Sequence, residues 1–206
     1  GSGHKRIAGA GDFVHLRNRG RTVGQSRHSL RANYEAVAHG AVACALLRRD
    51  GLAAVASVNT ARGLQLRKDW SQGAFDLEDV ANAQTRMQAS APNGWRFLVC
   101  HHPPFTPTEA LVESSTRRSE KALKLLKPPA RTIVLCGHVH GFFLMEDPGT
   151  GVRIVAAPSL ASSRERGAGA GFVLLTVTPA AVAIQRWRHD GASFVADAAT
   201  SSVAAV

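Results

Sequence analysis

The chain has 206 residues, of which 45% are hydrophobic, and a formal net charge of +10. This length suffices for one domain with a sizeable core. No run of the sequence approaches the roughly 18 apolar residues of a membrane-spanning helix, and residues 1–13 contain no continuous apolar segment. We therefore expect no membrane partner, no signal peptide and a cytoplasmic protein.

The positive charge would suit an anionic partner. Lys and Arg residues are spread over the whole chain, however, without a dense basic block. We therefore do not expect a nucleic-acid partner, and a small anionic phosphate substrate would account for part of the same charge.

The sequence divides into three parts. Residues 1–39 show no sustained hydrophobic period, so we expect a poorly structured N-terminal segment with at most a short helix near 29–37. The domain itself is expected over 40–197. Residues 198–206 are small and polar, which predicts a disordered tail.

Strands and helices alternate through the middle of the domain. Asp50-Gly51 between two apolar runs predicts a hairpin, because Asp-Gly favours tight turns. Asp76 is a suitable N-cap for a helix with acidic residues in its first turn, and Pro128 stops a second helix. The predicted elements are a strand before the turn, a strand at 52–58, helices at 75–90 and 116–126, and strands at 96–100 and 132–136.

Antiparallel hairpins are predicted for the remainder of the domain. The expected pairs are "FFLMED" with "VRIVAAPS" and "GFVLLTVTP" with "AVAIQRWRHDG", closed by a short strand "ASFVAD". Alternating strands and helices followed by hairpins favour a layered α/β sandwich over a bundle or a barrel.

Two of the apolar strands lead directly into histidines. The strand at 96–100 runs into "HHPPF", and the strand at 132–136 runs into "GHVHG". Residues i and i+2 of an extended segment point the same way, so His138 and His140 are predicted to face one pocket. Imidazole is a common ligand of zinc, iron, nickel and copper. With one histidine from the other strand end, three nitrogens would be available to a metal ion.

The three cysteines, Cys44, Cys100 and Cys136, predict no disulfide framework. Cys100 and Cys136 are expected to be small buried hydrophobes. Zinc ligation by their thiolates is the alternative. Strand residues alternate, however, so a cysteine that precedes a ligand faces the opposite side of the sheet.

The "GHVH" motif after one apolar strand and the "HHPP" motif after another resemble the last two signature motifs of the calcineurin-like metallophosphoesterases. That superfamily includes purple acid phosphatases and class III cyclic-nucleotide phosphodiesterases. The order of the motifs, their spacing and the helix between them agree with the family, as do "SVNTARG" after a strand and the closing hairpin. The resemblance covers roughly residues 40–190.

The resemblance implies a layered αββα-type sandwich and a bimetallic site for the hydrolysis of phosphoric esters. In the family two divalent ions, Mn, Fe or Zn, clamp the phosphoryl oxygens. By motif matching, His101, His138 and His140 would be metal ligands. His102 would lie beside the site as a structural or substrate-binding residue.

The family's other metal ligands come from earlier motifs, Asp-x-His, Gly-Asp and Gly-Asn-His-Asp/Glu, and none is intact in this sequence. Asp12 follows no apolar strand, and His4 lacks the neighbouring asparagine and acid. The resemblance therefore covers the C-terminal half of the family's fold, with an incomplete site that would hold at most one metal ion. We expect the open sheet edge to be covered by the N-terminal segment, a complementing chain or an oligomer.

Two functions remain open from the sequence. The first is a metal-dependent phosphodiesterase or phosphatase that acts on a small phosphate ester. The alternative is a non-catalytic binding or scaffold domain that keeps the metallophosphoesterase fold without a complete site.

Overall fold

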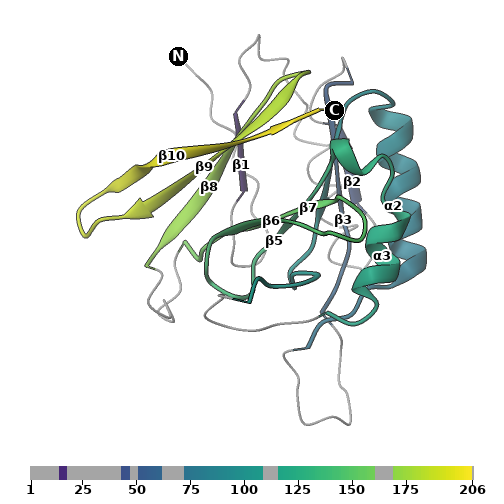
Figure 1. Cartoon of the computed structure of the whole chain (residues 1–206), viewed down its shortest axis with the longest axis horizontal. Coiled ribbons are helices and arrows are strands. Elements are labelled where there is room, and N and C mark those ends of the chain that lie inside the picture. The colour runs from purple at the N-terminus through teal and green to yellow at the C-terminus, as the bar shows by residue number, and fades with distance from the viewer. Residues whose placement is uncertain are drawn as a thin grey trace.

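The computed structural model describes residues 14–17, 43–46, 51–61, 72–108, 116–160 and 169–205, with the backbone alone for the first two ranges. The helix expected near 29–37 and the side chain of Cys44 lie outside the described residues. The described elements form two β-sheets and a layer of helices (Figure 1).

The strands and helices are as follows. The strands are β1 (Val14–Arg17), β2 (Ala43–Leu46), β3 (Ala53–Ser57), β4 (Trp95–Val99), β5 (Thr132–Cys136), β6 (Phe143–Glu146), β7 (Arg153–Ala156), β8 (Gly171–Val177), β9 (Ala181–His189) and β10 (Phe194–Ala204). The helices are α2 (Leu77–Ser90), α3 (Ser119–Leu125) and the short 3-10 helix η1 (Pro129–Arg131).

The larger sheet has the strand order β2-β3-β4-β5-β7-β6, and the smaller one has the order β1-β8-β9-β10. Within the larger sheet β3, β4, β5 and β7 run parallel, whereas β2 and β6 pair antiparallel at its edges. Three predicted hairpins are confirmed: β2–β3 and β6–β7 at the edges of the larger sheet and β8–β9 in the smaller sheet.

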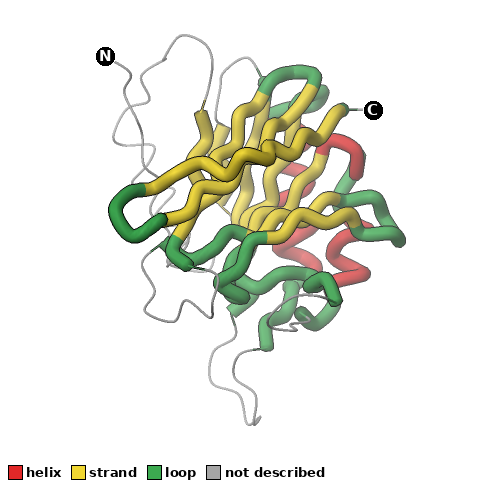
Figure 2. Tube along the Cα trace, turned by 60° about the vertical axis from the view of Figure 1, so that its left-hand side comes forward, coloured by secondary structure: helices red, strands yellow, loops and turns green. Residues whose placement is uncertain are grey.

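The two sheets pack face to face, and α2 and α3 cover the outer face of the larger sheet (Figures 1 and 2). In the part of the chain that the structure describes, no helix covers the far face of the smaller sheet. The layered α/β sandwich predicted from the sequence is therefore confirmed for both sheets and one helical layer.

Helix α2 begins where the sequence predicts. The carboxylate of Asp76 accepts a hydrogen bond from the backbone N–H of Glu78 at 2.9 Å, which satisfies one of the unpaired groups of the first turn. Val80, Ala83 and Met87 recur at helical spacing and are fully buried. The helix thus presents one apolar face to the sheet.

Helix α3 begins later than predicted, at Ser119 rather than at residue 116. Arg118 has a left-handed backbone with φ of 65°, so the helical turn cannot extend toward the N-terminus through it. The rest of the prediction holds, because Leu123 and Leu126 are buried and Pro128 follows the end of the helix.

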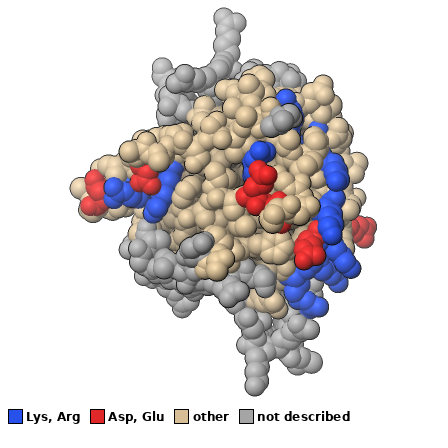
Figure 3. Space-filling view, viewed as in Figure 1, with Lys and Arg blue, Asp and Glu red and all other residues tan. Residues whose placement is uncertain are grey.

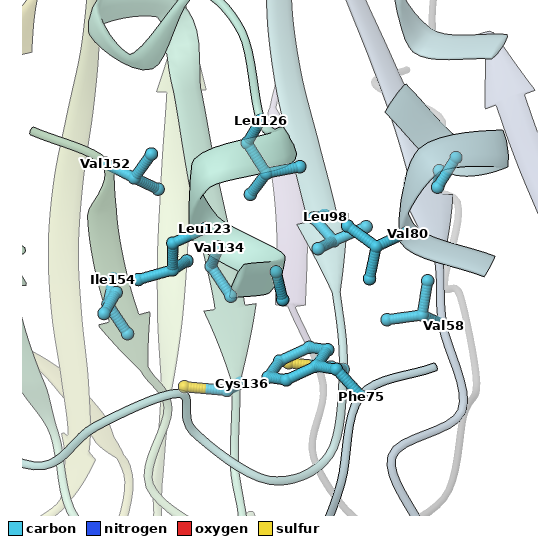
Figure 4. Packing of buried hydrophobic residues seen from close by; sticks show 14 of the residues in the cluster. Val58, Phe75, Val80, Leu98, Leu123, Leu126, Val134, Cys136, Val152 and Ile154 are labelled. Atoms are coloured by element: carbon cyan, nitrogen blue, oxygen red, sulfur yellow. The ribbon is translucent and has the colours of Figure 1, made fainter. Parts of the chain in front are cut away.

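Two apolar cores lie on opposite faces of the parallel strands, because successive side chains of a strand point to opposite faces. Trp95 and Phe97 of β4 face the smaller sheet, whereas Leu98 faces the helices. Figure 4 shows Val80 and Leu123, one from each helix, among the buried side chains over this face of the sheet. Strands buried on both faces are typical of parallel sheets.

The predicted disordered tail at 198–206 is wrong for its described part. Strand β10 extends to Ala204 and pairs with β9 along most of its length. Val203 is buried between the two sheets at 4% exposure. Alanine and serine gave no apolar alternation, but the edge of β9 supplies the backbone partners that order this segment.

The N-terminal segment contributes a strand as well. β1 lies inside the region expected to be poorly structured, and it pairs in parallel with β8 in the register Val14 to Val173. Within the described residues, the N-terminal segment therefore supplies an outer strand of the smaller sheet.

Charged side chains on the described surface include two larger groups, besides the ion pair of Arg153 with Glu146 at 3.3 Å on β7 and β6. At the β9–β10 hairpin, basic and acidic groups mix: Arg188 and Arg186 both lie within ion-pair distance of Asp197, at 2.9 and 3.7 Å. Basic side chains gather on the side where the helices lie (Figure 3), and Lys121 and Lys124 of α3 are exposed. None of the described helices is long and apolar enough to cross a membrane.

A buried arginine holds two loops to the central sheet. Arg96 of β4 is fully buried, although it lies in a strand that the sequence reads as apolar. Its guanidinium donates to the carbonyl oxygens of Ala91, Pro92 and Lys127 at 3.1, 2.7 and 3.0 Å. Burial, and second the nearby Arg131, lower the pKa of this group.

Replacing this arginine should destabilise the fold. Arg96→Met keeps an apolar stem but leaves three carbonyls without their donor, and a buried unsatisfied group costs about 1–3 kcal/mol. We expect a loss of about 3 kcal/mol in the free energy of unfolding, measured by urea denaturation. The matched control Lys121→Met, at an exposed position, should change it by less than about 0.5 kcal/mol. Equal effects of the two variants would contradict this role.

The two strand-end cysteines are core residues. Cys100 and Cys136 are 7% and 5% exposed and belong to the apolar cluster under the helices. The Cys100 thiol donates to the carbonyl of His102 at 3.3 Å. Burial raises the pKa of Cys100 from 9.0 to about 12.

Cys100 should therefore resist alkylation in the folded protein. The thiolate is the reactive form. The rise of the pKa from 9.0 to about 12 lowers the fraction of thiolate at pH 8 by about 1000-fold. We expect the Cys100 peptide to stay unmodified by iodoacetamide in native protein and to react fully after unfolding in guanidinium, as measured by mass spectrometry. Rapid modification of the native protein would contradict this burial.

Candidate metal centre

The two histidine motifs meet at one edge of the larger sheet. β4 and β5 run parallel with Val99 opposite Leu135, so both strands end at the same edge. The hydrogen bonding continues beyond the strands, since the Gly137 N–H donates to the carbonyl of His101 at 3.0 Å. This bond places the start of one motif directly against the start of the other.

Three imidazoles come together there. One ring nitrogen from each of His101, His102 and His138 lies within 4.8 Å of the others. The closest pair is His138 Nδ1 and His101 Nε2, at 3.1 Å. The ring centroids are separated by 4.7, 5.0 and 4.4 Å for the pairs 101–102, 101–138 and 102–138.

The "GHVH" motif is not extended, which corrects a premise of the sequence analysis. His138 and His140 both have left-handed backbones, with φ of 67° and 59°. A hydrogen bond from the Val139 N–H to the Gly137 carbonyl, at 2.8 Å, closes a tight turn around His138. Val139 points into the core at 4% exposure. Strained backbone of this kind clusters at functional sites.

This turn separates the two histidines of the motif. His138 lies against the two histidines of the other strand end, whereas His140 is half-buried and is not a member of the close group that the described residues form. Because the backbone of this turn is not extended, its residues i and i+2 do not have to point the same way. The assignment of His140 as a metal ligand stays a prediction.

His102 has two neighbours that the sequence analysis did not single out as site residues. The hydroxyl of Thr60 lies 3.0 Å from its ring Nδ1 and accepts its backbone N–H at 3.1 Å. Gly73 packs against the ring so closely that an added Cβ would lie 2.4 Å from Cγ. Thr60 follows the end of β3, and this position in the sequence could have indicated that it lies near the site. Nothing in the sequence indicated Gly73.

The donor set fits one ion better than two. Two nitrogens on a tetrahedral zinc ion, each about 2.0–2.1 Å from the metal, lie about 3.3 Å apart. The 3.1 Å between His138 Nδ1 and His101 Nε2 is close to that spacing. Within the described ranges the group contains no carboxylate, and carboxylates normally bridge two hard charges. These residues alone do not build a two-metal centre.

No family model matches the sequence, and no curated protein does. Among solved structures the chain is similar to a dimetal phosphatase from Danio rerio, with a TM-score of 0.57 and 8% identity over 88% of this chain. The chain covers 66% of that phosphatase, just under two thirds of its length.

Two structures of Vps29 from Entamoeba histolytica are also similar, a single mutant and the wild type complexed with Zn²⁺. Their TM-scores are 0.34 and 0.32, with 10% and 9% identity over 72% of this chain and 98% of theirs. Scores this low do not bear on the fold.

The likeness to the dimetal phosphatase is structural, since its sequence identity is only 8%. With a TM-score of 0.57, it supports the layered arrangement of two sheets and helices. The chain therefore has an α/β fold of the metallophosphoesterase kind.

Proposed function

We propose that the chain is a metal-dependent phosphoric ester hydrolase, a phosphodiesterase or phosphatase that acts on small phosphate esters. The observation that carries this proposal is the contact between His101 and His138, from neighbouring parallel strand ends. It is supported by a fold similar to that of a dimetal phosphatase.

The residues of the group suit a divalent ion of borderline softness. Imidazole nitrogens bind zinc and iron well, and manganese is the third candidate from the family resemblance. A bound ion would polarise a phosphoryl oxygen and neutralise developing charge. His101 is exposed, so its side of the group is open to a substrate, while His138 is half-buried. His140 is retained in the proposal as a further ligand from the same turn.

A second candidate function is a non-catalytic scaffold or binding domain. The specific observation in its favour is that the group of the described residues has no carboxylate. A complementing chain that supplied carboxylates would complete the site, and such a partner would belong to the hydrolase and not to this alternative. The two functions make different predictions once metal is bound.

Metal stoichiometry tests the site. We expect at most one tightly held zinc ion per chain after dialysis at neutral pH, measured by elemental analysis, because three imidazoles can surround a single ion. His138→Ala should release that ion. His189→Ala, at an exposed position on the β9–β10 hairpin, should retain it. Two tightly held ions per chain would reveal carboxylate ligands outside the described residues.

Hydrolysis separates the two functions. We expect chromogenic phosphate monoesters or diesters to be hydrolysed only when manganese, iron or zinc is added, because the proposed site acts through its ion. The activity should be lost in His101→Ala and kept in His189→Ala. A chain that binds metal with wild-type stoichiometry but turns over neither class of ester would favour the scaffold.

A further inference from the structure

We propose that His102 is the third nitrogen ligand of this metal centre, held in its ligating orientation by Thr60 and Gly73. The proposal rests on the metal centre proposed above. It differs from the role that the sequence motif implies for His102, a structural or substrate-binding residue, and it names two positioning residues.

The burial of His102 favours a ligand over a substrate contact. His102 is only 5% exposed, whereas its neighbour His101 is exposed. A substrate must reach the residue that binds it, but a metal ligand needs only to reach the ion. One ring nitrogen of His102 already lies within 4.8 Å of the ligand atoms of His101 and His138.

Thr60 determines which ring nitrogen is available. Its hydroxyl accepts the backbone N–H of His102 at 3.1 Å and lies 3.0 Å from Nδ1. A hydroxyl oxygen has two acceptor lone pairs, so it can accept the Nδ1–H as well. With the proton on Nδ1, Nε2 carries the lone pair that would bind a metal. Histidine ligands typically donate their second ring nitrogen to such a partner, which fixes the tautomer and the ring orientation.

Gly73 packs closely against the ring of His102. A Cβ at this position would lie 2.4 Å from Cγ and 2.6 Å from Nδ1 of His102, which is closer than real Cβ contacts come. The backbone around it cannot easily withdraw. The Ala74 N–H donates to the Thr60 carbonyl and the Arg117 N–H donates to the Gly73 carbonyl, both at 3.0 Å. The absence of a side chain is thus what allows the ring to lie here.

Two backbone segments that are distant in sequence therefore converge on one ring. The segment after β3 supplies the hydrogen bond, and the segment before α2 supplies the close packing. Thr60 is itself buried at 1% exposure, so water does not compete for its hydroxyl. A side chain held this closely has lost its rotamer freedom before an ion arrives, which lowers the entropic cost of binding.

The experiment measures zinc affinity by competition with a chromogenic chelator. Thr60→Val preserves shape but removes the hydroxyl, and we expect it to weaken zinc binding about 10- to 100-fold. Thr60→Ser should restore most of that loss. His102→Ala and Gly73→Ala should each weaken binding at least as much as Thr60→Val, and more than His140→Ala does. His189→Ala should leave the affinity unchanged, and circular dichroism should confirm that every variant is folded.

A second measurement separates positioning from a merely structural effect. Side-chain nitrogen NMR of metal-free protein should find His102 as the Nδ1–H tautomer, and Thr60→Val should change that tautomer in a folded protein. Wild-type zinc affinity in folded His102→Ala, together with its loss in His140→Ala, would overturn the inference and leave the proposed hydrolase standing. Absence of zinc binding by the wild-type chain would overturn both.

Discussion

The parallel ladder between β4 and β5 is the constraint on which the rest of the site depends. Its register brings both carboxyl ends to one edge, and the bond from the Gly137 N–H to the His101 carbonyl extends the pairing past the last strand residue. Polar side chains that directly follow such strands lie in the space beyond the carboxyl ends of the sheet. The contact between the two histidine motifs is therefore a product of backbone pairing, and it does not need the ion to form.

The alternation of side chains along the strands stabilises the register of β4 and β5. Each strand places one set of residues against the helices and the next against the smaller sheet. Cys100 and Cys136, the last apolar residues before the motifs, face the helical core. Because both cores are filled, a slip by one residue would move each side chain into the opposite core, where its size and shape no longer match its neighbours. The register that aligns the histidines is thus enforced by packing on both sides of the sheet.

Local patterns in the sequence predicted the elements that local chemistry controls. Asp76 caps α2 as expected, and His101 and His138 lie together at the ends of β4 and β5, whereas His140 is not in the close group of the described residues. What escaped prediction depends on contacts between distant segments. β10 forms a strand because it pairs with the edge of β9. Gly73 has no side chain, so its residue type does not indicate a contact with His102. A residue's type indicates its own conformational preference, whereas the structure of β10 and of Gly73 depends on the segments that they contact.

The ligand chemistry also bears on what the centre can attract. Imidazoles are neutral donors, so a divalent ion held by His101, His102 and His138 would keep its full double positive charge. Carboxylate ligands would cancel part of that charge. A bound cation is commonly the largest charge in its surroundings, and this one would lie beside the exposed His101. Binding of a phosphate group therefore follows from the neutral ligands in either proposed function. Hydrolysis makes a further demand, because the attacking water must be activated as well as the phosphate held, and that step is where the absence of carboxylates among the described ligands matters most.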